Sequence, residues 1–337
     1  MASWKENRVQ QKIPCIFEIE VKDENSRKRS NQSFRVLAVD CLNSEASSSC
    51  LQDAWLSEKL DGTCCYVSPF KGKPWLWARY DRKPNKIGER KFKKYQSLLN
   101  SWRKDGRNGD KPSISWDLLK DFKECPDNWI PALGVPVKDS TAQPDDGGHT
   151  PGWVPIDVKS RQHCWHLSAV DLIQSLALVL RENEDEGLTV ECLPLSDLLG
   201  QTVELIGTNI NGNPYHIGTK PQPIHVLVKH GSISVSCPPV PQLSTLTDWL
   251  QHAQDGQVEG VVWHCQNGKL FKLHRNHVNL MWPAANPRLA RQTVQVCVDP
   301  AQFELPDDRS LFPAFSSVNG RSCDSLKNLH ELVFHNS

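Results

Sequence analysis

The sequence lacks the long apolar runs and the leader that mark membrane and secreted proteins. No apolar run approaches the ~20 residues that span a bilayer. The polar start, MASWKENRVQQK, lacks the apolar core that a signal peptide contains. We therefore expect no contact with a membrane and a location in the cytosol or nucleus. Hydrophobic residues at 38% and charged residues at 23% are typical of a folded globular protein.

Closely spaced cysteine pairs are also missing. The twelve cysteines are scattered singly apart from the adjacent Cys64 and Cys65, and none shows the C-x2-C to C-x4-C spacing of a structural zinc site. This pattern argues against a zinc module and against a disulfide scaffold. We expect reduced and mostly buried thiols. The chain contains no internal repeat.

The chain has no net charge, with 39 basic and 39 acidic residues, but one segment is strongly basic. From Lys71 to Lys94, ten basic residues stand against two acidic ones, and four aromatic residues are interleaved. Such a segment can neutralise phosphates and stack on bases, although a solvated cationic loop is the alternative. The candidate contacts to nucleic acid are Arg82, Lys83, Lys91, Lys93 and Lys94.

Short β-forming runs and a few helical segments predict a mixed α+β fold. Strands are expected over residues 16–22, 34–38, 63–68, 74–80, 202–206 and 224–228. Apolar spacing predicts helices over 168–182 and 244–254. Residues 84–150 are polar and hold no long periodic segment, which favours an insertion or a mobile flap. After residue 283 the sequence becomes irregular and rich in proline.

One lysine stands inside a Lys-x-Asp-Gly tetrad, Lys59 to Gly62, before the β-forming run TCCYV. Asp-Gly is a common turn dipeptide, so one interpretation is a wet surface turn. The other is a nucleophilic amine held at a strand-to-turn junction, where a phosphorus electrophile can be presented to it. The tetrad alone does not decide between them.

Two further stretches place charge among apolar residues. Asn267-Gly268 separates two β-rich runs, and a two-residue type I′ hairpin there would put Glu259, Lys272 and His274 on one face. Glu204 lies inside the β-forming run TVELI, where burial is costly unless the carboxylate meets a cation, a metal or a hydroxyl. A surface hairpin with scattered charges and an outward-facing strand glutamate are the alternatives.

These charged positions follow the order of a known superfamily. The tetrad, LWARYDRK, VELIG, VEGVVW and FKLH resemble the ordered motifs of covalent nucleotidyltransferases, which comprise ATP-dependent DNA and RNA ligases and mRNA capping enzymes. The neighbouring stretches EKLDGTCCYV, GWVP, PLSDLL, ELIGTNINGNPY and EGVVWHC look like the vertebrate 5′-to-3′ RNA ligase 1 family. The resemblance covers about residues 14–282.

The resemblance implies a fold and a domain plan. It implies a ligase adenylation fold with twisted antiparallel sheets and flanking helices over residues 13–282, interrupted by the polar insertion near 84–150. Residues 1–12 are expected to be a flexible start, and 283–337 a small C-terminal extension. Of the 337 residues, only 65 follow Lys272, which leaves little room for the OB-fold domain of DNA ligases and capping enzymes.

The resemblance also implies an activity. It is that of an ATP-dependent RNA ligase, which joins RNA ends carrying a 5′-phosphate and a 3′-hydroxyl through lysyl-AMP and RNA-adenylate intermediates. Lys59 is then the adenylated nucleophile, and Lys272 and His274 hold the α-phosphate. Glu204 binds the ribose, and Glu259 supports a catalytic Mg²⁺ (or Mn²⁺). Many relatives have lysine at the position of His274, which leaves that phosphate contact open.

The remaining roles are less fully specified by the resemblance. Asp61 assists the metal and the nucleotide, Arg79 contacts ribose or phosphate, and Glu58 helps to read adenine. His225 is a candidate for stacking on the base. A GTP-dependent capping-type guanylyltransferase and a non-catalytic RNA-binding relative stay open as alternatives. We expect RNA as the partner and no obligate protein partner.

Overall fold

The computed structural model describes residues 8–22, 24, 34–106, 108–184, 187–235, 239–302 and 310–335. The chain forms two compact units. The first contains residues 1–76 and 156–337, and the second, Trp77–Pro155, is inserted between its two segments. No helix among the described residues is long and apolar enough to cross a membrane.

A large sheet forms the centre of the first unit, with strand order β18-β17-β12-β11-β14-β13-β4-β5 and β10 paired to β11. Its strands are β4 (Thr63–Phe70), β5 (Lys73–Arg79), β10 (Val170–Asp171), β11 (Leu176–Glu182), β12 (Leu188–Pro194), β13 (Thr202–Gly207), β14 (His225–Lys229), β17 (Val294–Cys297) and β18 (Ser322–Cys323). Most pairs are antiparallel, but β11 with β14 and β12 with β17 are parallel. The strands predicted over 63–68, 202–206 and 224–228 are confirmed.

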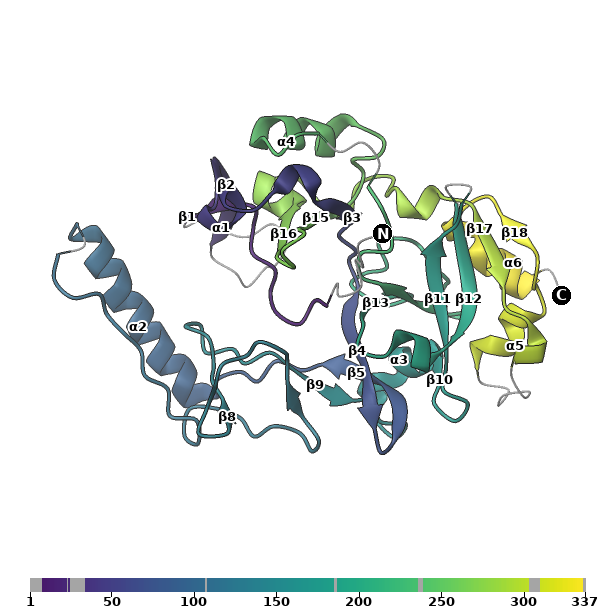
Figure 1. Ribbon diagram of the computed structural model, residues 1–337, viewed down its shortest axis with the longest axis horizontal. Coiled ribbons are helices and arrows are strands. Elements are labelled where there is room, and N and C mark those ends of the chain that lie inside the picture. The colour runs from purple at the N-terminus through teal and green to yellow at the C-terminus, as the bar shows by residue number, and fades with distance from the viewer. Residues whose placement is uncertain are drawn as a thin grey trace. The chain divides into compact units, whose positions relative to one another are not determined.

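A second, smaller sheet has the order β16-β15-β3, with β3 at Trp55–Glu58, β15 at Gly260–His264 and β16 at Leu270–His274. The hairpin of β1 (Phe17–Lys22) and β2 (Arg35–Leu42) and the short helix α1 (Ser44–Ser47) belong to the same core. Helix α4 (Leu243–His252) buries Leu246 and Leu250 in this core. Figure 1 shows the helix beside β15 and β16. The predicted helix at 244–254 and the predicted strand at 16–22 are therefore confirmed.

The hairpin between β15 and β16 has a longer loop than predicted. The N–H of Cys265 donates to the carbonyl of Lys269 at 2.9 Å, and the N–H of Gly268 donates back to Cys265 at 2.9 Å. Gly268 has a φ of +78°, a left-handed conformation that glycine adopts at little cost. The connection is thus a three-residue loop closed by a left-handed glycine, and not the predicted two-residue turn.

One extra loop residue shifts the pairing register by one. Val262 pairs with Lys272, and Gly260 pairs with His274. Lys272 and His274 still share a face, but Glu259 precedes β15 and has no place in this pairing. The predicted register, on which the common face of all three residues rested, is therefore wrong.

The helix predicted over residues 168–182 is also wrong. A short helix, α3, covers Cys164–Ser168, and the chain then forms β10 and β11. β11 lies inside the sheet, and its residues Leu176–Leu180 are all buried. A strand buried on both faces is apolar at successive positions, so its sequence also satisfies the spacing of a helical face.

The end of the chain is part of the first unit's core. β17 pairs in parallel with β12, and helices α5 (Leu311–Ser316) and α6 (Leu329–His335) bury Phe312, Phe315 and Leu329 against the large sheet. The irregular segment expected after residue 283 thus completes the hydrophobic core.

The start of the chain is anchored where it is described. Residues 1–7 of the predicted flexible start lie outside the described residues. The N–H of Val9 donates to the Thr202 hydroxyl at 2.7 Å, and Gln10 is buried. Pro14 and Ile16 exchange backbone hydrogen bonds with Lys272. The segment that precedes β1 is therefore an added edge on β16.

The second unit contains a long helix that was not predicted. Helix α2 spans Lys86–Lys104, and the side chain of Asn85 caps it by accepting from the N–H groups of Ile87 and Gly88. Its half-buried residues Phe92, Tyr95, Leu99 and Trp102 recur at spacings of three and four, which is the apolar period of a helix and was overlooked in the polar segment. The rest of the unit is β6 (Ile130–Pro131), β7 (Val137–Lys138), β8 (Thr141–Ala142) and β9 (Gly152–Pro155), with β9 paired to the last residues of β5.

Candidate active site

Lys59 lies at the junction between the two sheets of the first unit. It directly follows β3, and its N–H donates to the carbonyl of Gly260 at 2.9 Å, which fixes the backbone on β15. Its Nζ donates to Glu259 Oε2 at 2.5 Å. The lysine side chain keeps 24% of its surface exposed, whereas Glu259 keeps 3%. The amine is therefore a half-buried partner of a buried carboxylate and still open to a ligand.

Three carboxylates control the charge of this lysine. Burial alone lowers the pKa of the Lys59 ammonium, but the negative charges of Glu259, Glu204 and Asp61 outweigh that effect and raise the pKa above its ordinary value. In the ligand-free protein Lys59 is thus an ammonium ion. It becomes a nucleophile only when the hold of Glu259 on its proton is relieved.

Lys272 has the opposite electrostatic environment. Burial and the neighbouring cations Lys59 and Lys12 lower the pKa of Lys272 to about 8. Burial, together with the same cations, lowers the pKa of His277 to about 4. Lys272, Lys59 and Lys12 thus bring positive charges close together, which favours the binding of an anion.

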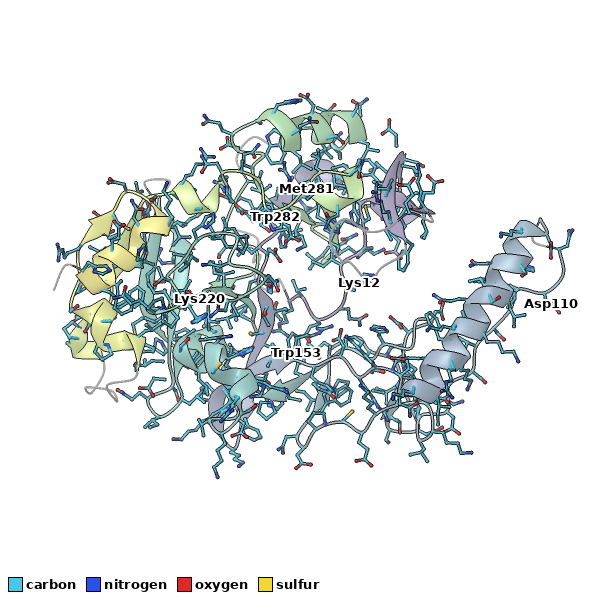
Figure 2. The ribbon with its side chains drawn as sticks, turned by 180° about the vertical axis from the view of Figure 1, so that it is seen from behind. Lys12, Asp110, Trp153, Lys220, Met281 and Trp282 are labelled. Carbon is cyan, nitrogen blue, oxygen red and sulfur yellow. The ribbon has the colours of Figure 1, made fainter. Side chains whose placement is uncertain are left out.

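A cavity of about 630 Å³ lies beside this group of cations. It is bounded by the β1–β2 hairpin, the segment before β1, and β16 with the turn after it. Its lining includes the cations Lys12, Arg35 and Lys272 and the imidazole rings of His274 and His277. Glu18 is its only acidic lining residue among those that the structure describes. Figure 2 labels Lys12, which the sequence analysis placed in a flexible start.

The Lys-x-Asp-Gly tetrad is not a solvent-exposed turn. Asp61 keeps 9% of its surface exposed, and its N–H donates to the Tyr215 hydroxyl at 2.9 Å. The two oxygens of the Asp61 carboxylate accept from Asn211 Nδ2 and from the indole N–H of Trp282, each at 2.8 Å. Asp61 thus holds the loop in place, and its direct contact with a metal stays a prediction.

Gly62 is required by a close approach of two strands. Its N–H donates to Glu204 Oε1 at 3.0 Å. A Cβ added there would lie 2.4 Å from the carbonyl oxygen of Leu205 and 2.8 Å from Glu204 Cγ. Any other residue would push the tetrad away from β13, and with it the Lys59 amine.

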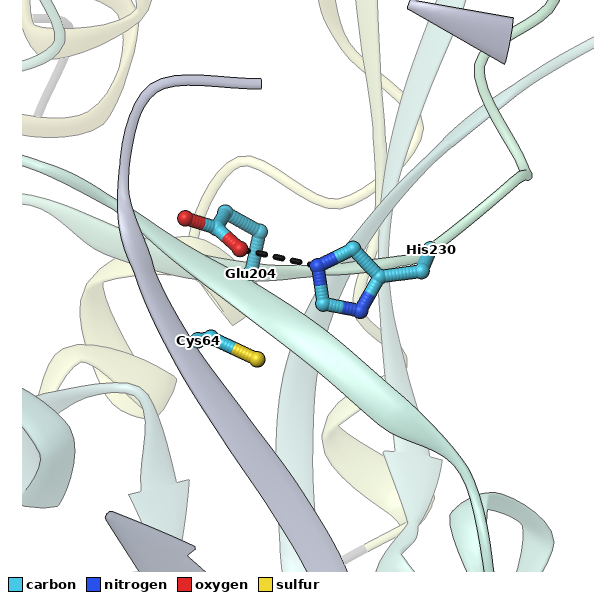
Figure 3. Close-up of side chains that lie close together, drawn as sticks. All are labelled: Cys64, Glu204 and His230. Atoms are coloured by element: carbon cyan, nitrogen blue, oxygen red, sulfur yellow. Dashed lines mark hydrogen bonds and ion pairs between the residues drawn. The ribbon is translucent and has the colours of Figure 1, made fainter. Parts of the chain in front are cut away.

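Glu204 is buried and bound on both oxygens. Oε2 lies 2.8 Å from His230 Nε2, while Oε1 accepts from the tetrad. The other ring nitrogen of His230 lies 3.0 Å from Thr202 Oγ1. Cys64, on the neighbouring strand, completes a cluster with Glu204 and His230 (Figure 3). Glu204 therefore faces inward. The sequence did not indicate its partner His230, because this residue follows β14 and belongs to no recognised motif.

Glu58, the residue before the nucleophile, is a fully buried carboxylate. Arg288 Nη1 lies 3.5 Å from its Oε2, and no described residue hydrogen-bonds its Oε1. Burial raises the pKa of Glu58 to about 7, and Glu182 and Glu259 add to this effect against the opposing charge of Arg288. A buried oxygen without a partner is costly in the free protein and is ready to accept a hydrogen bond from a ligand.

His225 is a buried and fully bonded ring. Its Nδ1 lies 2.8 Å from Ser168 Oγ, and its Nε2 lies 2.6 Å from the carbonyl of Thr208. Trp165 stacks on the ring, with a centroid distance of 4.9 Å. None of the ring is exposed. The geometry argues against base stacking in this conformation, and that role stays a prediction.

The basic residues of the second unit fall into two groups. Arg79 pairs with Asp81 at 2.6 Å and lies over the ring of Trp153. Arg82 donates to backbone carbonyls and lies over the ring of Phe122.

Lys91 belongs with these internal contacts, because its Nζ lies 2.7 Å from the buried carboxylate of Asp121. Lys83, Lys93 and Lys94 are instead exposed. Of the five predicted nucleic-acid contacts, only these three present an open ammonium group.

The fold and the site define an α+β protein that holds a lysine amine among carboxylates, beside a cationic cavity. The family described as RNA ligase 1 matches residues 4–332 of this chain. Proteins named RNA ligase 1 from Danio rerio, Rattus norvegicus and Mus musculus are 44%, 42% and 41% identical to it. Each alignment covers 95% of this chain and 97% of the relative. The chain therefore belongs to the RNA ligase 1 family, as its motifs predicted.

Proposed function

We propose that this protein is an ATP-dependent RNA ligase that joins a 5′-phosphate to a 3′-hydroxyl. The observation that carries the proposal is the placement of Lys59 Nζ, partly exposed and paired with Glu259, close to the cations Lys272 and Lys12. Membership of a family whose relatives are named RNA ligase 1 supports it.

The first step would attach AMP to Lys59. The amine attacks the α-phosphorus of ATP, an N–P bond forms, and the bond to the pyrophosphate oxygen breaks. The lysine must first lose one proton. In the free protein the negative charge of Glu259 stabilises the protonated amine. Phosphate oxygens that reach Lys272 and the cationic cavity would have their growing charge stabilised by groups already in position.

A divalent cation suits the same carboxylate. Glu259 offers hard oxygen donors, which Mg²⁺ or Mn²⁺ prefer, and it is positioned at the amine. When bound there, the ion would supply positive charge to the phosphates. Glu259 would then no longer stabilise the Lys59 ammonium, so the amine loses its proton more easily.

The base is the part of the nucleotide that distinguishes ATP from GTP. Glu58 Oε1 is a buried acceptor without a partner among the described residues. Adenine carries an amine at the position where guanine carries a carbonyl oxygen. In its ionised form, which prevails above its pKa of about 7, Glu58 accepts a hydrogen bond from the adenine amine and repels the carbonyl oxygen of guanine, so this form favours ATP. The GTP-dependent alternative lacks this support.

The later steps would transfer AMP to the 5′-phosphate of RNA and then displace it. The RNA phosphate attacks the phosphorus of the bound AMP, and the phosphoramidate bond to Lys59 breaks. This leaves an RNA adenylate and a free lysine. The 3′-hydroxyl then attacks the adenylated end, a phosphodiester forms and AMP leaves. The exposed Lys83, Lys93 and Lys94 are the proposed RNA contacts of the second unit.

The test is the intact mass of the protein after incubation with Mg²⁺ and either ATP or GTP. We expect the mass of one AMP to be added with ATP and nothing to be added with GTP. Addition from GTP alone would instead favour the capping-type alternative. No addition from either nucleotide would favour a non-catalytic RNA-binding protein.

A further inference from the structure

Three potential metal ligands lie on one face of three adjacent strands. Cys64 on β4 is the direct cross-strand partner of Glu204 on β13, and Val228 on β14 is the partner of Glu204 on its other side. His230 lies two residues beyond Val228. Because alternate residues of a strand share a face, Cys64, Glu204 and His230 project to the same side of the sheet.

The donor atoms of these side chains are close enough to meet one ion. The Cys64 sulfur, a Glu204 carboxylate oxygen and a His230 ring nitrogen all lie within 4.8 Å of one another (Figure 3). Glu204 is buried, and the other two are half-buried. A thiolate, an imidazole and a carboxylate are ligands of Zn²⁺ and similar borderline-soft ions, whereas Mg²⁺ prefers oxygen alone.

The surrounding contacts hold two of the ligands in place. Thr202 Oγ1 lies 3.0 Å from His230 Nδ1, so Nε2 is the ring nitrogen that faces Glu204. The N–H of Gly62 fixes Glu204 Oε1 and leaves Oε2 toward the cluster. Outer contacts of this kind orient the ligands of protein metal sites.

We propose that Cys64, Glu204 and His230 form a binding site for Zn²⁺ or a similar borderline-soft divalent ion, and that this ion excludes the nucleotide. On binding, the Cys64 thiol releases its proton to solvent, and the proton between His230 Nε2 and Glu204 leaves Nε2, so that the neutral ring carries its proton on Nδ1, toward Thr202 Oγ1. The hydrogen bond between Glu204 and His230 is then replaced by two bonds to the ion. Three protein ligands leave a fourth position open to water. The exclusion of nucleotide rests on the proposed function, in which Glu204 binds the ribose.

Cobalt binding tests the site without any catalytic readout. Co²⁺ replaces Zn²⁺ in such sites, and a cysteine ligand produces a thiolate-to-cobalt charge-transfer absorption. We expect this absorption to saturate at one equivalent of Co²⁺ in the reduced protein and to disappear when Zn²⁺ is added. C64S and H230Q should abolish it, and C164S, which changes an exposed cysteine of α3, should keep it. Thermal unfolding followed by circular dichroism checks that each variant is folded.

Two outcomes would overturn the site. An unchanged absorption in folded C64S would assign the cobalt to another thiol. No thiolate absorption in the wild type would show that His230 only positions Glu204 by a hydrogen bond.

A second experiment measures formation of the AMP adduct on Lys59 in the presence of Zn²⁺. We expect Zn²⁺ to inhibit the wild type, with less inhibition at higher ATP, and to inhibit C64S at least ~10-fold more weakly because one ligand is removed. Equal inhibition of both proteins would overturn the exclusion of nucleotide. Failure of the proposed function is recognised separately, since an inactive protein forms no adduct without Zn²⁺ yet still gives the cobalt result.

Discussion

Lysine is used in opposite ways by the two units of this molecule. In the first unit Lys59 is half-buried, anchored through its backbone and paired with a carboxylate that is itself buried. In the second unit Lys93 and Lys94 are exposed on a polar helix. Burial makes the charge of a lysine depend on its partners, whereas exposure leaves a fixed charge that salt screens. The first environment suits chemistry at one atom, and the second suits the attraction of a polyanion.

The strongest test of this comparison is the removal of the buried amine. We expect Lys59→Ala to fold and to accept no AMP from ATP, because the nucleophile is gone and little packing is removed. Lys220→Ala, at an exposed lysine of the same unit, should label like the wild type. Intact mass spectrometry measures both. A retained adduct in Lys59→Ala would place the nucleophile elsewhere.

Glu259, the partner of the Lys59 amine, should matter in the later sealing step. We expect Glu259→Ala to slow the sealing of pre-adenylated RNA in Mg²⁺ without ATP by ~10²-fold, because a charge-positioning carboxylate is removed. Lys59→Ala should retain appreciable sealing, since this step needs no new lysyl-AMP. Single-turnover ligation measured on a gel compares the two. Wild-type sealing by Glu259→Ala would remove Glu259 from this step.

The exposed lysines should affect RNA binding alone. Reversing Lys93 and Lys94 to glutamate should weaken RNA binding and flatten its salt dependence, by about one unit of slope for each RNA phosphate that the variant no longer neutralises. Adduct formation with ATP should stay unchanged. Lys91 is left intact because it neutralises the buried Asp121.

Lys120→Glu, at a lysine whose side chain is 82% exposed, is the matched control for this prediction. Equal RNA affinity of wild type and double variant over several salt concentrations would show that α2 is only a solvated surface.

The smallest expected effect is a pH dependence of stability from Glu58. Its pKa rises from 4.5 to about 7 on folding, so its contribution to stability is fully present below 4.5 and is lost as the pH rises through 7. Glu58→Gln should therefore gain stability relative to the wild type on going from roughly pH 5 to pH 8. Urea unfolding at both pH values measures this, with Glu45→Gln as the exposed control. A pH-independent difference would contradict the raised pKa.

Some of this molecule is determined locally and can be read from the sequence. The β-forming runs of β4, β13 and β14 fold as predicted, and so does helix α4, because their periods and turn residues act over a few neighbouring positions. The order of the charged motifs was enough to place the chain in its family. Family motifs also singled out Lys59 and Glu259, which prove to be partners.

Tertiary structure decided how those positions meet. Lys59 and Glu259 are 200 residues apart and form an ion pair only because β3 and β15 are neighbours. The hairpin register depended on one loop residue, and the choice of strand for β11 depended on burial on both faces. His230, which no motif marks, reached Glu204 through the pairing of β13 with β14. Local sequence preferences act over a few residues, whereas these contacts arise from the packing of strands that lie far apart in the chain.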